Sequence, residues 1–157
     1  RVRISVADVA SDGPFSTLAG VDRWFAVLDG AGVELTIDGN AQRVTAADDA
    51  LAFAGAAETR CRLIDGPTRD LNLMLRGVAG ALARVVPGET WQPDARACGL
   101  YATAAGACRI GGHDDGPAAI PAQALYWWHA APTALAFDGS GWWLRADTAG
   151  EATRAAR

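Results

Sequence analysis

Short runs in which apolar and polar residues alternate dominate this chain. Val2, Ile4 and Val6 are separated by polar residues, and the same period of two continues through residues 33–38, Val-Glu-Leu-Thr-Ile-Asp. This period is typical of a β-strand with one buried face. Helical periodicity is almost absent, so the pattern predicts an all-β protein.

Turn-forming residues separate these runs. Asp-Gly occurs at residues 29–30, 38–39, 65–66 and 138–139, and Pro-Gly occurs at 87–88. Such residues tolerate the positive φ angles of tight turns. Many short strands joined by tight turns indicate an antiparallel sandwich or barrel. The segment 111–117, Gly-Gly-His-Asp-Asp-Gly-Pro, is expected to form a surface loop.

The two halves of the chain resemble each other. Residues 37–39 match 110–112, and 65–66 match 138–139, both at an offset of 73, while 50–53 match 124–127 at 74. Matches in order at nearly one offset indicate two similar β-units. We therefore expect one domain, 1–157, with units of about 1–78 and 79–157; accidental resemblance between β-hairpins is the alternative.

Length and charge limit the classes of function. A chain of 157 residues can bury a well-filled core without stabilising disulfides or metal ions. The net charge is -4 and the basic residues are scattered, which argues against nucleic acid as a partner. No apolar run is long enough to span a bilayer, and the first residues lack the features of a signal peptide, so we expect no membrane association and a cytoplasmic location.

Three cysteines, Cys61, Cys98 and Cys108, lie in apolar, strand-like surroundings. Their odd number favours a reducing compartment with free, buried thiols. A disulfide between Cys98 and Cys108, which could flank one hairpin, is the alternative.

Three stretches carry a resemblance to a known family. They are Gly-Pro-Phe-Ser at residues 13–16, Gly-Val-Asp-Arg at 20–23 and Asp-Gly-Pro-Thr-Arg-Asp-Leu-Asn-Leu-Met at 65–74. In this order they closely resemble the HutD/Ves family of cupin-like proteins. Residues 27–39 and 49–53 also have the spacing of a cupin hairpin. The resemblance covers residues 1–77 by motif and the remainder by the order of elements.

The resemblance implies a double-cupin (bicupin) antiparallel β-barrel and a bacterial protein, associated with histidine utilisation or induced by stress. It implies sensing or limiting of a pathway intermediate such as urocanate or formylglutamate, without an established enzyme activity. The family's usual N-terminal segment, with an Asn-Gly-Gly-Gly-x-Thr motif, is not among these 157 residues. Pocket residues from that segment would extend the set given below.

Residues 70–76, Asp-Leu-Asn-Leu-Met-Leu-Arg, predict a strand with two unlike faces. The leucines at 71, 73 and 75 need a dry core, so Asp70 and Asn72 should face either bulk water or a polar barrel interior. The pattern alone favours water. The resemblance favours the interior, because the family motif centres on these residues.

Arg23 lies in an otherwise nearly apolar strand, residues 22–28, and is expected to be buried. A buried guanidinium needs a partner, because an unpaired buried charge is costly. One alternative is a salt bridge to Asp22, Asp65 or Asp70. The other is a two-pronged grip on a ligand carboxylate, which the planar fork of arginine suits.

Phe15 and Ser16 follow a Gly-Pro turn. Phe15 could form an apolar wall of a pocket, and Ser16 could donate a hydrogen bond to a ligand. The alternative is a loop anchor in which the phenyl ring plugs one end of the barrel.

Two tryptophan pairs occur at residues 127–128 and 142–143. On a strand, one ring of each pair must face each side. Packing in the core and between units is one explanation, and an exposed aromatic strip that forms a homodimer is the other.

The histidines argue against a metal centre. Cupins often bind iron, manganese or zinc through a His-x-His pair, a carboxylate and a distant third His, whereas this chain has only His113 and His129, sixteen positions apart. We expect no metal and no other cofactor. Nucleophilic catalysis, which needs a Ser or Cys beside a His, also lacks support, because the positions of the two histidines are uninformative.

These observations predict a metal-free protein that binds a small carboxylate metabolite, or regulates through it, in the first unit. The alternative is a metal-independent cupin enzyme, an isomerase or lyase, with Asp70 as a proton-transferring base. Burial that raises the pKa of Asp70 would favour the base, whereas pairing with Arg23 would favour binding. The expected ligand-binding residues are Arg23, Asp70, Asn72, Phe15, Ser16 and Met74.

Overall fold

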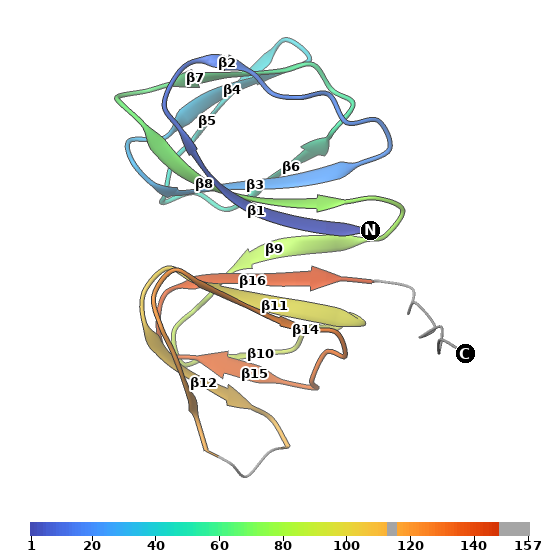
Figure 1. Ribbon diagram of the computed structural model, residues 1–157, viewed down its shortest axis with the longest axis vertical. Coiled ribbons are helices and arrows are strands. Elements are labelled where there is room, and N and C mark those ends of the chain that lie inside the picture. The colour runs from blue at the N-terminus through green and yellow to red at the C-terminus, as the bar shows by residue number, and fades with distance from the viewer. Residues whose placement is uncertain (113–115, 148–157) are drawn as a thin grey trace, which may run out of the picture. The chain divides into compact units, whose positions relative to one another are not determined.

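The computed structural model describes residues 1–112 and 116–147. Within these ranges the chain forms strands and turns and contains no helix (Figure 1). The described strand pairs run antiparallel. The predicted all-β antiparallel fold is therefore confirmed. The described residues contain no helix that could cross a membrane.

The chain divides into two compact units. The first unit comprises residues 1–77 and 81–84, and the second comprises residues 78–80 and the chain from Val85 onward. The division falls at β9 (Gly80–Arg84). Each unit contains two antiparallel sheets, so the predicted two-unit architecture is also confirmed.

The first unit contains two four-stranded sheets, ordered β1-β8-β3-β6 and β2-β7-β4-β5. Figure 1 shows these sheets facing each other. The strands are β1 (Val2–Val9), β2 (Gly13–Pro14), β3 (Asp22–Asp29), β4 (Val33–Ile37), β5 (Asn40–Val44), β6 (Leu51–Ala54), β7 (Thr59–Leu63) and β8 (Thr68–Leu75).

In the second unit the strands follow the orders β14-β11-β16 and β10-β15-β12-β13. They are β10 (Thr90–Trp91), β11 (Ala97–Ala102), β12 (Gly106–Ile110), β13 (Ala118–Ile120), β14 (Ala124–Trp128), β15 (Leu135–Phe137) and β16 (Gly141–Ala146). Here β12 pairs with β13 and β15, just as β4 pairs with β5 and β7 in the first unit.

The repeated pairing explains the sequence self-match. Strands β4, β6 and β8 begin at residues 33, 51 and 68, and their counterparts β12, β14 and β16 begin at 106, 124 and 141, each 73 residues later. The other equivalent strands begin 75 to 78 residues apart. The two halves therefore share the order of strands, with an offset of 73 at three of them.

The core of the second unit is apolar. Trp143 of β16 packs in it, and its ring stacks on Trp91 with centroids 4.8 Å apart and planes 6° apart. Trp142 and Trp143 are both buried, as core packing requires. Leu125 and Tyr126 on the edge strand β14 are exposed. The homodimer through aromatic strands stays a prediction.

The three cysteines are free and buried, as predicted. Burial raises the pKa of Cys98 to about 12, with a smaller contribution from Cys108, whose own pKa burial also raises. Burial likewise raises the pKa of Cys61 to about 11. Thiols held protonated in this way are poor nucleophiles.

Two turn glycines offer a matched test of the first unit's packing. Gly30 and Gly39 both have positive φ, 94° and 82°. A Cβ on Gly30 would lie 2.5 Å from the Pro67 carbonyl oxygen, whereas one on Gly39 would meet nothing within 4 Å. We expect Gly39→Ala to lower the free energy of unfolding by about 1 kcal/mol and Gly30→Ala by at least about 2 kcal/mol. Urea denaturation measures both, and equal losses would contradict this account of the turn.

Candidate functional site

The polar residues of the first unit lie on one face of the sheet that contains β8. Three cross-strand pairs join β3 to β8 along this face: Arg23 with Met74, Phe25 with Asn72, and Val27 with Asp70. Paired residues project to the same side of a sheet. Phe25 and Val27 belong to the core cluster formed with β4, β5 and β7, so this face is the interior of the unit. The leucines at 71, 73 and 75 lie on the opposite face and are buried.

The side chain of Arg23 is held inside this face, with a relative exposure of 6%. Its Nη2 donates a hydrogen bond of 2.8 Å to Oδ1 of Asn72. The guanidinium carbon lies 4.7 Å from the ring centroid of Phe15 and 5.2 Å from that of Phe53. Such cation–π contacts favour a cation in a partly dry environment.

No carboxylate neutralises Arg23 within the described part of the chain. Its Nε is buried and has no hydrogen-bond acceptor. Burial lowers the pKa of Arg23, and the positive charge of Arg3 lowers it further. The salt bridge to Asp22, Asp65 or Asp70 that the sequence allowed is therefore wrong. An amide oxygen and two phenyl rings replace the expected acid.

Arg3 adds a second guanidinium to the same face. It lies on β1 opposite Met74, which is opposite Arg23 on the other side of β8. Arg3 is exposed, and among residues 1–112 and 116–147 it forms no ion pair or hydrogen bond. Two arginines on this face, neither paired with an acid among the described residues, make this end of the unit attractive to an anion.

Asp70 is completely buried on the same face. Its Oδ2 accepts a hydrogen bond of 3.2 Å from the hydroxyl of Thr68, whereas its Oδ1 is buried and has no partner among the described residues. Burial raises the pKa of Asp70 to about 6; the hydrogen bond from Thr68 opposes this rise and the charge of Asp8 adds to it.

Burial increases along β8 away from Arg3. Met74 is half-buried, Asn72 is 6% exposed and Asp70 is 0% exposed. The carboxyl of Asp70 therefore lies at the most buried end of this row, and the two arginines lie at its more exposed end.

The structure brings together five of the six residues expected in the site: Arg23, Asp70, Asn72, Phe15 and Met74. Ser16 is exposed and forms no hydrogen bond within the described residues. Sequence reasoning missed Arg3, Phe53 and Thr68. Arg3 is one of the polar residues in the alternating pattern of β1, and Phe53 lies in a recognisable strand, but only the strand register places them beside Arg23.

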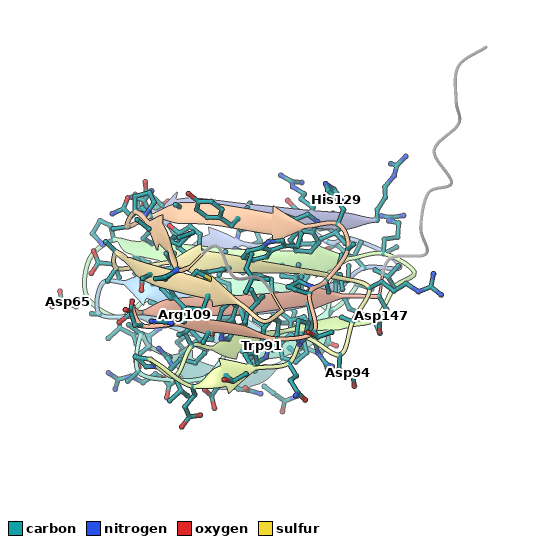
Figure 2. The ribbon with its side chains drawn as sticks, turned by 90° about the horizontal axis from the view of Figure 1, so that it is seen from below. Asp65, Trp91, Asp94, Arg109, His129 and Asp147 are labelled. Atoms are coloured by element: carbon teal, nitrogen blue, oxygen red, sulfur yellow. The ribbon has the colours of Figure 1, made fainter. Side chains whose placement is uncertain are left out.

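The second unit has no equivalent polar interior among its described residues. Trp143 lies 73 positions after Asp70 and fills the corresponding place in the core. A groove of about 300 Å³ lies on this unit beside Arg109, which is labelled in Figure 2 and is exposed. The groove is lined by Thr90, Arg109, Ile110, Gly111, Gly112, Gly116, Ala134, Leu135 and Ala136.

The histidines do not form a metal site in the described residues. His129 is exposed at the end of β14 (Figure 2), and His113 lies outside the described residues. No group of three or more His, Cys, Asp or Glu side chains among residues 1–112 and 116–147 could hold a metal ion.

Comparison with known proteins agrees with this architecture. The HutD family model matches residues 1–144. The chain belongs to the HutD family. HutD from Pseudomonas fluorescens SBW25 has a TM-score of 0.80 and 25% identity, covering 95% of this chain and 80% of that one. A cupin 2 conserved barrel domain protein from Leptotrichia buccalis, 12% identical with a TM-score of 0.54 over 91% of this chain and 81% of its own, shows the cupin-like fold alone.

Two curated relatives of this HutD-family chain each match just under half of its length. An uncharacterized 21.2 kDa protein in the hutC 3' region of Pseudomonas putida is 43% identical over 72 residues, 46% of this chain and 38% of that protein. Protein Ves of Cronobacter sakazakii (strain ATCC BAA-894) is 37% identical over 75 residues, 47% of this chain and 41% of that protein. The matches span about two fifths of these relatives' length, and the length of each is close to that of the first unit.

Proposed function

We propose that the first unit of this HutD-family protein binds a small carboxylate metabolite through Arg23 and Asn72, with Arg3 attracting the anion. The observation that carries the proposal is the buried guanidinium of Arg23, which among the described residues has an unused Nε and no paired acid. Burying a cation without a counter-ion is costly, so a buried, unpaired cation indicates a site that binds an anionic ligand. A carboxylate fits the planar donor fork of arginine.

Asn72 completes the proposed contact. Its Oδ1 fixes the Arg23 side chain, while its Nδ2 forms no hydrogen bond with the described residues. That amide can donate to a second ligand oxygen. Phe15 and Phe53 flank the guanidinium and exclude water, which strengthens its attraction for an anion.

The relatives suggest a ligand from histidine degradation. The protein from the hutC 3' region and HutD itself carry names that refer to hut genes, and the Pseudomonas fluorescens HutD structure is described as a formate condition. Formate is the smallest carboxylate. We propose urocanate or formylglutamate as ligands and a regulatory role for their binding.

Thermal unfolding tests the proposed carboxylate site. Acetate, butyrate, urocanate and formylglutamate would be compared with acetamide and butyramide at equal ionic strength. A ligand at one hundred times its dissociation constant adds about 2.7 kcal/mol, which for a domain of this size raises Tm by about 5 to 10 °C. Carboxylates should raise Tm and amides should not. If none of the carboxylates raised Tm, the proposed carboxylate site would be refuted.

A second candidate function is a metal-independent isomerase or lyase with Asp70 as the base. The observation that favours it is the raised pKa of Asp70, about 6, together with its lack of pairing to Arg23. A base with such a pKa works near neutral pH. Incubation of a bound carboxylate in D₂O separates the two functions, because a base exchanges a carbon-bound proton of its substrate for deuterium, and a binding protein does not.

A further inference from the structure

Three buried side-chain atoms in the first unit lack hydrogen-bond partners among the described residues. One is Nε of Arg69, which lies 3.8 Å from Oδ1 of Asp8 in an ion pair. Of the other two, Nε of Arg23 is a donor without an acceptor, and Oδ1 of Asp70 can accept but receives no donor. Their residues are 6% and 0% exposed. Leaving such atoms unpaired costs stability, and native proteins keep few of them. Both atoms belong to side chains on one face of one sheet, so a single bound molecule could satisfy both.

The strand geometry sets the distance between the Arg23 and Asp70 ends of this row of side chains. Asp70 and Asn72 are two positions apart on β8, which corresponds to about 7 Å along the strand. Arg23 is tied to Asn72 by its hydrogen bond, so its positive charge lies near the Asn72 level. A ligand of four or five bonded atoms covers a span of this size.

We propose that the ligand of the first unit is a carboxylate that carries a hydrogen-bond donor, a hydroxyl or N–H, at its other end, and that Oδ1 of Asp70 accepts this donor. The inference rests on the proposed function above and adds the chemical class of the ligand. The carboxylate meets Arg23 near the more exposed end of the row, and the donor reaches the fully buried end.

The surroundings of Asp70 exclude the competing classes of ligand tail. An alkyl tail would leave Oδ1 unpaired. A second carboxylate would meet the ionised Asp70, beside which Asp8 already adds negative charge. The hydroxyl of Thr68 and the protonated thiol of Cys61 carry no charge, and the nearby cation, Arg69, is already paired with Asp8 at 3.8 Å. Only a donor improves this end of the site.

Three probes of similar length distinguish these tails. Pentanoate ends in a methyl, 4-hydroxybutyrate has a hydroxyl at the same place, and succinate ends in a second carboxylate. At pH 8 we expect calorimetry to show 4-hydroxybutyrate binding about tenfold more tightly than pentanoate, the gain typical of one hydrogen bond to a charged group. Succinate should bind more weakly than 4-hydroxybutyrate.

Two variants assign the preference to Asp70. Asp70→Leu should abolish the advantage of 4-hydroxybutyrate over pentanoate, because it removes the acceptor. Asp70→Asn keeps the shape and offers an amide donor, so it should shift the preference toward succinate. Should the leucine variant fail to fold, the asparagine variant and the three probes on the unaltered protein still decide the matter.

The outcomes separate this inference from the proposed function. If none of the three probes binds, the carboxylate site itself fails. If all bind and Arg23→Met weakens all of them, but 4-hydroxybutyrate has no advantage over pentanoate, the carboxylate site stands and the donor is refuted. A preference for succinate in the unaltered protein would overturn the inference in the same way.

Discussion

Arg23→Met should lower the affinity for a carboxylate ligand by about 30-fold to several thousand-fold, corresponding to about 2 to 5 kcal/mol. The ligand would lose the partner of its charge in a place where water is excluded by Phe15 and Phe53. Truncation to alanine, Arg23→Ala, should have an effect of the same size. Calorimetry with a carboxylate that the unaltered protein binds gives the measurement.

The same substitution should change folding less than the loss of a buried ion pair would. Breaking a buried ion pair costs about 3 to 5 kcal/mol, because a charge is left unpaired. Arg23 has no such pair among the described residues, and its replacement by an apolar chain of similar length removes one hydrogen bond to Asn72, so it should lower the free energy of unfolding by about 1 to 2 kcal/mol. A loss of 3 kcal/mol or more would reveal a buried acid that Arg23 neutralises.

Arg60→Met is the matched control. Arg60 lies in the same unit, but its side chain is 72% exposed and pairs with Glu58 at the surface. Surface pairs of this kind contribute little. Affinity and stability should both remain unchanged in this variant. Unchanged affinity in Arg23→Met as well would exclude Arg23 from the site.

The faces of β8 could be predicted because they depend only on the period of two. Once the leucines at 71, 73 and 75 are placed in a dry layer, Asp70 and Asn72 must lie together on the other side. The sequence alone left open whether that side meets water or an interior. The burial of Asp70 decides for the interior.

The environment of Arg23 could not be predicted in the same way. The sequence predicts a carboxylate partner as one alternative for Arg23, because most buried charges are neutralised by an opposite charge. The actual neighbours, Asn72, Phe15 and Phe53, come from three segments whose register is set by long-range strand pairing. Arg3 reaches this face only because β1 pairs with β8 about seventy residues later in the chain. No local pattern carries that information.

The unequal interiors of the two units illustrate the same limit. Both halves share a strand order, three of their equivalent strands begin 73 residues apart, and the sequence predicts both to be cupin-like. Their interiors differ because Trp143 occupies in the second unit the place that Asp70 has in the first. An indole that stacks on Trp91 fills its space with apolar contacts, whereas a carboxyl leaves polar atoms to be satisfied.

Asp70→Asn should remove a pH dependence of stability that the unaltered protein shows between about pH 4 and pH 6. The folded-state pKa of Asp70, about 6, is higher than its ordinary value of 3.8, so the folded state binds the proton more tightly than the unfolded state does. The stabilisation from this proton is complete below the ordinary pKa and is lost as the pH rises through the folded-state pKa. The gap between the two values corresponds to on the order of 2 to 3 kcal/mol.

Asparagine has nearly the same shape as aspartate and cannot ionise, and its Oδ1 can still accept the hydrogen bond from the Thr68 hydroxyl. The free energy of unfolding of the Asp70→Asn variant should therefore change less between pH 4 and pH 8 than that of the unaltered protein. The difference should be on the order of 2 kcal/mol. Urea denaturation followed by tryptophan fluorescence at several pH values measures both curves. Groups that titrate elsewhere affect both proteins equally, so the difference between the curves isolates Asp70. Parallel curves would mean that Asp70 is ionised throughout this range, and its carboxylate would then be paired or solvated in the folded protein.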